Sequence, residues 1–182
     1  MTEIAVILGS EPQAFLERHR PSDLPNDPAG TSIELRAKAM WGLGKVRGRI
    51  NALEGSGVVG EDGAVSGTIV FDATSIDTKN KKRDTHLRSG DFFEVEKYPT
   101  FAYSATGATP TDEGKLKVTG SLTIKDQSRP LDLLVSAARA APGRATLTAE
   151  AEIDRRQWGM TWAKMGAGVI NHVVVVAQFT RS

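Results

Sequence analysis

The chain has 182 residues, no cysteine, and 23 Lys and Arg against 22 Asp and Glu, for a formal charge of +1. A chain of this length is expected to form one domain that buries about 70% of its unfolded surface, so folding needs no disulfide or metal. The absence of cysteine excludes thiolate chemistry, and the balanced charge argues against a nucleic-acid binder that relies on a broad basic face.

Residues 1–29 are predicted to form a leader ahead of the first strand. The tetrapeptide S-E-P-Q at Ser10 has the pattern of a capping box with proline in the first turn, which predicts a short helix ending near His19. Segment 21–28 contains three prolines and is predicted to be a loop. We expect this leader to be a packed flap or an arm on a partner subunit.

The apolar run 4–8 is the part of the leader that bears on location. It is too short to span a membrane, and no basic segment precedes it as in a secretory signal. Since the chain also begins with Met1, we expect a cytoplasmic protein.

From Thr31 onward, apolar and polar residues alternate with a period of two, which predicts strands with one apolar face. The predicted strands cover 31–39, 45–54, 65–72, 101–106, 116–124, 129–135, 146–153 and 169–180. About seven to nine such strands with short turns and almost no helix are typical of an all-β sandwich or a closed barrel. Periodicity alone does not choose between these two folds.

The stretch from Thr74 to Pro99 interrupts this alternation. A short helix is predicted over 80–88, with Asp77 and Thr78 as N-cap residues and with Asp84 and Arg88 paired at i,i+4. Four cations crowd the start of this helix, where the macrodipole is already positive. Two interpretations stay open: a solvated basic loop, or an anion site made from helix N–H groups and lysines.

The same stretch carries a family resemblance. From Ser75 it reads S-I-D-T-x-N-x-x-R-D-x-H-L-R-S-x-D-F-F-x-V-x-K-Y-P, and V-T-G-S-L-T-I-K-D-Q-S-R-P-L from Val118 and I-D-R-R-Q-W-G from Ile153 follow. This order of motifs resembles the YceI-like family of polyisoprenoid-binding proteins over roughly 30–179. The resemblance implies an all-β, eight-stranded antiparallel lipocalin-like β-barrel over 30–182, with one short helical insert after the short N-terminal helical leader.

The interior of such a barrel can be read in two ways. Small inward residues such as Ala149 and Ala151 leave space for an apolar chain, whereas aromatic residues such as Phe71 and Phe101 can close that space. The resemblance, which implies binding of isoprenoid or fatty chains, favours a lipid tunnel. The residues expected to line it are Leu35, Ala37, Ala39, Trp41, Ile69, Phe71, Phe101, Tyr103, Leu122, Leu133, Val135, Leu147, Ala149, Ala151, Trp158, Val173, Val175 and Phe179.

Polar groups at the tunnel mouth are expected from the basic start of the helical insert. The candidates for binding a head group such as a pyrophosphate are Lys79, Lys81, Lys82, Arg83, His86 and Arg88. For Arg83 and Asp84 we favour a structural role, in which paired charges hold the insert on the barrel. Asp154 and Arg155 are likewise expected to form an ion pair at the end of a strand.

No catalytic or metal-binding motif is found. The three histidines are scattered over the leader, the insert and the last strand, with no zinc-ligand spacing. The chain has no G-x-S-x-G, G-x-G-x-x-G or P-loop motif and no cysteine nucleophile. We therefore predict no catalytic residue, no cofactor and no metal, and an enzyme acting on a lipid in the tunnel is only a minor alternative.

These observations predict a non-catalytic carrier of a long apolar lipid, either a polyisoprenoid or a fatty-acid derivative. The rival hypothesis is a barrel with a closed core that acts as a structural or stress-response interaction module. The expected partners are the lipid, a membrane in transient contact, and a second copy of the chain in a homodimer favoured by exposed strand edges and the leader. No nucleic-acid partner is expected.

Overall fold

The computed structural model describes residues 22–25, 31–39, 44–59, 64–141, 144–164 and 167–180. At 22–25, 35, 37–39, 44–45, 59, 137–141, 144–145 and 179–180 it describes the backbone alone. The leader helix that we predicted, and Trp41, lie outside the described residues.

Strands make up most of the described chain. They are β1 (Ser22–Pro25), β2 (Ser32–Ala39), β3 (Gly44–Val59), β4 (Val65–Asp77), β5 (Thr100–Pro110), β6 (Leu116–Ile124), β7 (Gln127–Pro130), β8 (Leu133–Ala141), β9 (Arg144–Asp154) and β10 (Ile170–Thr180). The described helical elements are α3 (Lys81–Arg88) and a single 3-10 turn, η3 (Arg155–Trp158).

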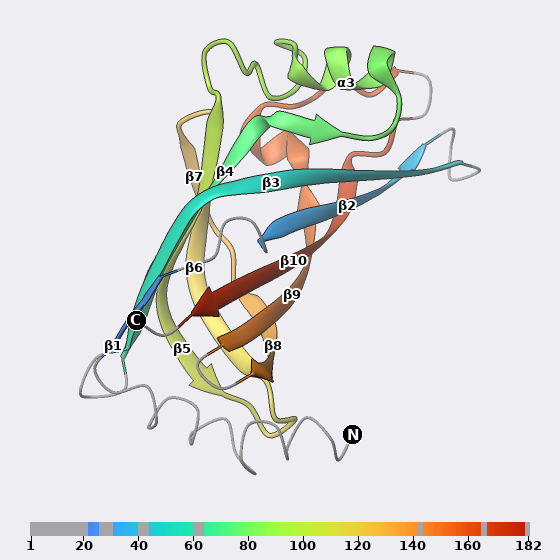
Figure 1. Cartoon of the computed structure of the whole chain (residues 1–182). Coiled ribbons are helices and arrows are strands. Elements are labelled where there is room, and N and C mark those ends of the chain that lie inside the picture. The colour runs from blue at the N-terminus through green and yellow to red at the C-terminus, as the bar shows by residue number, and fades with distance from the viewer. Residues whose placement is uncertain are drawn as a thin grey trace.

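Eight of these strands close into an antiparallel barrel. The hydrogen-bonded order is β3-β2-β10-β9-β8-β6-β5-β4, and β4 pairs back with β3 to complete the ring. The barrel is elongated, with α3 lying across one end and the β5–β6 turn at the other (Figure 1). The structure thus selects the closed barrel over the sandwich, as the resemblance implied.

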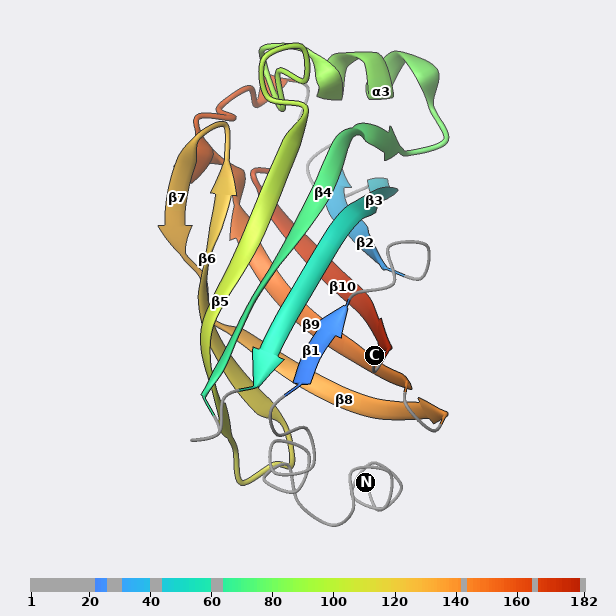
Figure 2. The ribbon, with the colours of Figure 1, turned by 60° about the vertical axis from the view of Figure 1, so that its left-hand side comes forward.

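Two short strands extend the sheet outside the eight-strand ring. β1 pairs with residues 56–59 of β3, beyond the part of β3 that β2 reaches. β7 pairs with residues 121–124 of β6, next to the part that pairs with β8. Figure 2 shows β1 beside β3 and β7 beside β6.

Both additional strands correct predictions made from the sequence. A loop was expected at 21–28, but 22–25 form β1, because the long β3 offers a free edge there and Pro25 stands at the end of the strand. Arg129-Pro130 was expected to open a strand, but it ends β7. Lys125 and Asp126 turn the chain back first, since both have positive φ, at 51° and 57°.

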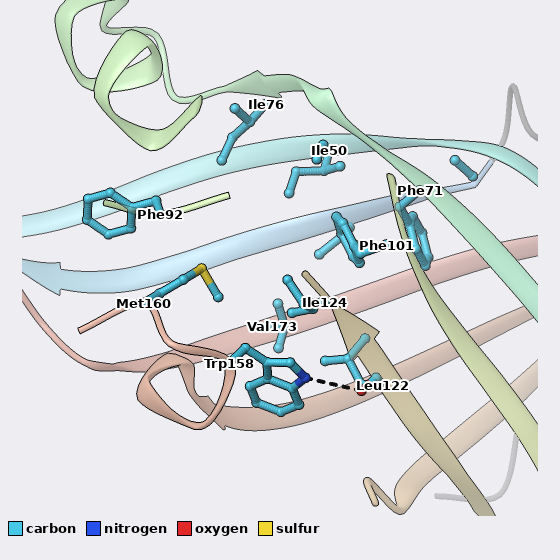
Figure 3. Close-up of a cluster of buried hydrophobic side chains, with 13 residues drawn as sticks. Ile50, Phe71, Ile76, Phe92, Phe101, Leu122, Ile124, Trp158, Met160 and Val173 are labelled. Atoms are coloured by element: carbon cyan, nitrogen blue, oxygen red, sulfur yellow. Dashed lines mark hydrogen bonds between the residues drawn. The ribbon is translucent and has the colours of Figure 1, made fainter. Parts of the chain in front are cut away.

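The barrel core divides into two clusters of buried apolar side chains. The larger one lies toward the α3 end and contains Ile50, Phe71, Ile76, Phe101 and Trp158 among others (Figure 3). The smaller one consists of Leu116, Val135 and Ala149 with partly buried neighbours, toward the β5–β6 turn. The alternation of apolar residues along the strands places these side chains inside the ring.

Gly120 has the closest surroundings of the glycines whose environment the structure describes, and it should tolerate a side chain poorly. An added Cβ would lie 2.5 Å from the backbone oxygen of Ser104 and 2.5 Å from Oη of Tyr103, whereas one at Gly107 would meet nothing within 4 Å. We expect Gly120→Ala to lower the free energy of unfolding by about 1–3 kcal/mol or more, and Gly107→Ala to change it by less than about 0.5 kcal/mol. Urea denaturation of both variants checks this, and equal costs would contradict the close packing of Tyr103 against β6.

Candidate ligand-binding site

A cavity of about 100 Å³ lies inside the barrel. Every one of the eight barrel strands contributes to its wall, and segments outside these strands contribute four more residues. The lining residues are Ile33, Ile50, Ile69, Phe71, Phe93, Phe101, Tyr103, Leu122, Ile124, Leu131, Leu133, Ala151, Ile153, Arg155, Met160, Asn171, Val173 and Val175. The wall is almost entirely apolar, so the greater part of the cavity suits hydrocarbon.

The structure brings nine of the residues expected in the tunnel to this wall. They are Ile69, Phe71, Phe101, Tyr103, Leu122, Leu133, Ala151, Val173 and Val175. Trp158 is buried in the larger core cluster without lining the cavity, and its Nε1 donates to the backbone oxygen of Leu122 at 3.2 Å. The side chains of Leu35, Ala37, Ala39 and Phe179 lie outside what the structure describes.

The remaining three expected residues, Val135, Leu147 and Ala149, belong to the smaller cluster. Ala149 is 6% exposed and packs with Leu116 and Val135, so this level of the barrel is filled by side chains. The interior is therefore open at one level and packed at the other, and both readings of the interior hold for part of its length.

Three stacked aromatic rings form one side of the wall. Phe71 and Phe101 are cross-strand partners on β4 and β5, with ring centroids 5.2 Å apart. Phe93, from the segment that follows α3, stacks on Phe101 at 5.8 Å. The third ring could not be assigned by strand alternation, because Phe93 lies outside every strand.

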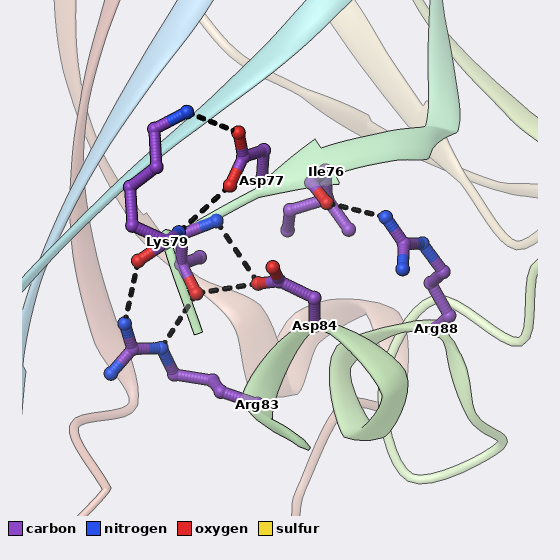
Figure 4. Close-up of polar contacts among 7 residues, drawn as sticks. Ile76, Asp77, Lys79, Arg83, Asp84 and Arg88 are labelled. Carbon is purple, nitrogen blue, oxygen red and sulfur yellow. Dashed lines mark hydrogen bonds and ion pairs between the residues drawn. The ribbon is translucent and has the colours of Figure 1, made fainter. Parts of the chain in front are cut away.

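The predicted mouth residues Arg83 and Arg88 instead fasten the insert to the end of β4 (Figure 4). Arg83 donates from Nε to Oγ1 of Thr78 at 2.7 Å, and Asp84 accepts from both the backbone N–H and the hydroxyl of Thr78. Arg88 donates to the backbone oxygens of Thr74 and Ile76 at 2.9 and 2.6 Å. These contacts are of the structural kind favoured for Arg83 and Asp84, but both side chains bind Thr78 and no ion pair with a described residue involves either of them.

Two finer predictions for this helix were wrong. The N-cap is Asn80, whose side chain accepts from the backbone N–H of Arg83 at 3.1 Å, and not Asp77 or Thr78. Asp84 and Arg88 make no ion pair, because each is engaged by the end of β4. The tertiary contacts with β4 outweigh the local i,i+4 attraction, which is weak on a solvated helix.

The other expected head-group residues lie on the surface of the insert. Lys79 pairs with Asp77 at 2.5 Å, and Nε2 of His86 lies 2.7 Å from Oδ2 of Asp91. Lys81 and Lys82 are exposed, and neither makes an ion pair with any described carboxylate. None of these side chains lines the cavity.

Tyr103, Arg155 and Asn171 are the lining residues with polar side chains in the described structure. Oη of Tyr103 donates to the backbone oxygen of Leu131 at 3.0 Å. Arg155 was expected to pair with Asp154, but Asp154 pairs with Arg156 at 2.6 Å. Arg155 turns inward and is 4% exposed, and burial lowers the pKa of its guanidinium from the ordinary value.

Tyr103 should titrate as a half-buried phenol. Burial, with a smaller contribution from the charge of Asp132, raises its pKa to about 12. The neutral phenol is therefore favoured in the folded state, and its contribution to stability is complete below the unfolded tyrosine pKa of about 10. That contribution is lost as the pH rises through about 12. Tyr103→Phe should remove an ionisation near pH 12 from the tyrosinate absorbance titration, and Tyr98→Phe should leave that ionisation in place.

Residues missed by sequence reasoning fall into two groups. Five of them lie on predicted strands, where alternation was the signal that could have identified them: Ile33, Ile50, Ile124, Leu131 and Ile153. Phe93, Arg155 and Met160 come from connecting segments, where no periodic signal exists. Asn171 also went unidentified, since a polar residue was not expected on an inward face.

Among the described residues there is no group of three or more His, Asp or Glu side chains placed to hold a metal ion. In the same part of the chain, no helix is long and apolar enough to cross a membrane.

Comparison with known proteins agrees with this architecture. A UPF0312 protein of Vibrio campbellii is 33% identical over 107 residues, which are 58% of this chain and 56% of that protein. One from Vibrio cholerae is 30% identical over 105 residues, 57% of this chain and 55% of that protein. The matched region thus spans about half the length of these curated relatives.

Two solved structures share the fold. BcnA of Burkholderia cenocepacia has a TM-score of 0.72 at 18% identity, covering 84% of this chain and 98% of BcnA. A polyisoprenoid binding domain from Saccharophagus degradans has a TM-score of 0.69 at 12% identity, covering 90% of this chain and 100% of that domain. The family model of the YceI-like domain matches residues 26–180, so this chain belongs to the YceI-like family.

Proposed function

We propose that this protein binds a long apolar lipid, a polyisoprenoid or a fatty-acid derivative, and carries it without catalysing a reaction. The observation that supports this most is the apolar cavity inside the barrel, to which all eight strands contribute. Fold similarity to a polyisoprenoid binding domain is consistent with the same class of ligand.

The size of the cavity limits how the lipid is held. A cavity of about 100 Å³ takes only a short part of a long chain, because an apolar cavity of about 150 Å³ holds one benzene molecule. A longer ligand therefore needs side chains to move apart. Met160 and Phe93 suit this role, since both come from connecting segments at the α3 end and the unbranched methionine adapts its shape easily.

The energetics favour carriage over storage. Each buried CH₂ gains about 0.8 kcal/mol of free energy relative to water, so a long apolar chain strongly prefers the cavity to water. The free-energy difference between the cavity and a bilayer is near zero, because lipid tails are as apolar as the cavity wall. Such a protein would therefore exchange its lipid with membranes.

Native mass spectrometry of the freshly purified chain, followed by organic extraction, tests this proposal. A mass excess that is lost on denaturation and extracts as a prenyl or acyl chain would establish the carrier and name the ligand class. A bare polypeptide, still bare after incubation with prenyl and fatty lipids, would favour the closed-core interaction module instead.

Transient contact with an anionic membrane is expected at the α3 end. Lys81 and Lys82 are exposed there with no ion-paired carboxylate in the described structure, and cations near an anionic surface strengthen attachment. We expect the double variant Lys81→Glu and Lys82→Glu to slow lipid transfer to anionic vesicles several-fold, and high salt to weaken the difference.

The matched control reverses charge at the opposite end of the barrel, with Lys115→Glu and Lys117→Glu near the β5–β6 turn (Figure 1). Transfer measured by the fluorescence of a labelled lipid should be slowed only by the first pair. Equal slowing by both pairs would mean that overall charge, and not this end of the barrel, governs the contact. The homodimer and the cytoplasmic location stay predictions, checked by light scattering and cell fractionation.

A further inference from the structure

Arg155 is the one charged side chain in the described wall of the cavity. It follows directly after β9 as the first residue of η3, and only 4% of its surface is exposed. Its backbone position places it at the α3 end of the barrel, whereas the β5–β6 end is closed by the smaller apolar cluster.

The guanidinium is held by backbone oxygens and an aromatic ring. Nε donates to Gly168 at 3.1 Å, Nη2 donates to Trp162 at 2.6 Å, and Nη1 donates to Met160. The Cζ atom lies 5.0 Å from the centroid of the Phe92 ring. These contacts use three of the five N–H groups of an arginine, which leaves one on each terminal nitrogen.

Among the described residues, no carboxylate lies within ion-pair distance of Arg155. The adjacent Asp154 is engaged instead by Arg156, with Nη2 and Oδ2 2.6 Å apart. A buried charge without a counter-ion is costly, and carbonyl dipoles compensate it only in part. An anion in the cavity would supply the missing charge and accept the remaining N–H groups.

We propose that Arg155 binds the carboxylate of the ligand, so that the preferred class is an apolar chain that ends in an acid. Asn171 adds a polar side chain to the same wall. It lies opposite Ile153 in the β9–β10 register, and Ile153 is two residues before Arg155 in the chain. This proposal rests on the proposed lipid-binding function. It moves the head group from α3, where Arg83 and Arg88 hold the insert in place, to the inside of the barrel.

A different role for Arg155 makes the opposite prediction. If the guanidinium only positions the backbone at Met160, Trp162 and Gly168, the cavity is purely apolar toward a ligand. An alcohol would then bind more tightly than an acid of the same chain length, because burying an ionised carboxylate costs more than burying a hydroxyl. The order of the two affinities therefore distinguishes the two roles.

The experiment is calorimetric titration of the delipidated full chain with hexadecanoic acid and with hexadecanol at neutral pH. We expect the acid to bind more tightly by about tenfold or more, the scale of one charge-assisted hydrogen bond. Arg155→Gln should remove or reverse this preference while hexadecanol still binds. Arg156→Gln, which removes the exposed neighbouring cation, is the matched control and should keep the preference.

Each outcome has a distinct meaning. If the wild-type chain binds neither compound, that result contradicts the proposed lipid-binding function and, with it, the proposed role of Arg155. Binding of both with the alcohol equal or tighter would overturn the role of Arg155 alone and leave lipid binding intact. The wild-type comparison decides the matter even if Arg155→Gln does not fold, and Arg155→Lys then serves as the variant that keeps the charge but alters the hydrogen bonds.

Discussion

Replacing Ala151 with tryptophan is expected to abolish lipid binding while the barrel stays folded. Ala151 is half-buried on β9 and lines the cavity, so an indole at this position would occupy the space proposed for the ligand. Because only part of the indole fits the cavity of about 100 Å³, the stability cost should fall in the lower part of the range of about 1–3 kcal/mol typical of overpacking.

Ala149 provides the matched control two residues earlier on the same strand. Ala149 and Ala151 lie opposite Val175 and Val173 of β10, so both face inward, but Ala149 packs in the filled cluster with Leu116 and Val135. Ala149→Trp should therefore cost the full ~1–3 kcal/mol or more through overpacking. Any effect on lipid binding should be smaller than that of Ala151→Trp.

Chemical denaturation and titration with hexadecanoic acid measure the two quantities for both variants. For Ala151→Trp we expect loss of binding with modest destabilisation. For Ala149→Trp we expect a larger loss of stability and a smaller effect on binding. Wild-type affinity in Ala151→Trp would place the ligand elsewhere. Similar stability losses in both variants would mean that no usable space exists beside Ala151.

Truncation of Trp158 is expected to cause the largest loss of stability. Its side chain is among the largest in the core, is 2% exposed, and its indole N–H donates to the backbone oxygen of Leu122. Trp158→Ala should lower the free energy of unfolding by about 3–5 kcal/mol, because the remaining cavity cannot fully collapse. Urea denaturation at constant pH measures this loss.

Two other aromatic changes serve as controls. Trp158→Phe keeps a large apolar ring but loses the hydrogen bond to Leu122, so most of the loss should be recovered. Trp162→Ala should cost less than Trp158→Ala, since Trp162 is only half-buried, beside His86 and Phe92. A cost below about 1 kcal/mol for Trp158→Ala would contradict the packing of η3 against β6.

Local patterns in the sequence were sufficient for the strands and for much of the cavity wall. The period of two is a property of an extended backbone, so it can be read without knowing which strands pair. It correctly placed Ile69 and Phe71 on one face of β4 and Val173 and Val175 on one face of β10. Closure of the ring was not readable from this pattern and came from the family resemblance.

Contacts between distant segments decided the rest. Asp84 and Arg88 sit at a spacing that suits a helical ion pair, yet both bind groups at the end of β4, because these contacts are more buried than a pair on the helix surface. Asp154 likewise pairs with Arg156 and not with the expected Arg155, because the guanidinium of Arg155 donates to the backbone oxygens of Met160, Trp162 and Gly168. Neither result has a signature in local sequence.

The inward direction of Ala149 and Ala151 is therefore determined by the sequence itself, because alternation along a strand is a local property of the backbone. What only the tertiary structure decided is that Ala151 borders a cavity while Ala149 lies in a packed cluster. That difference depends on which side chains the other strands bring to the same level of the barrel. Their identity follows from register and ring closure, which join residues far apart in the chain.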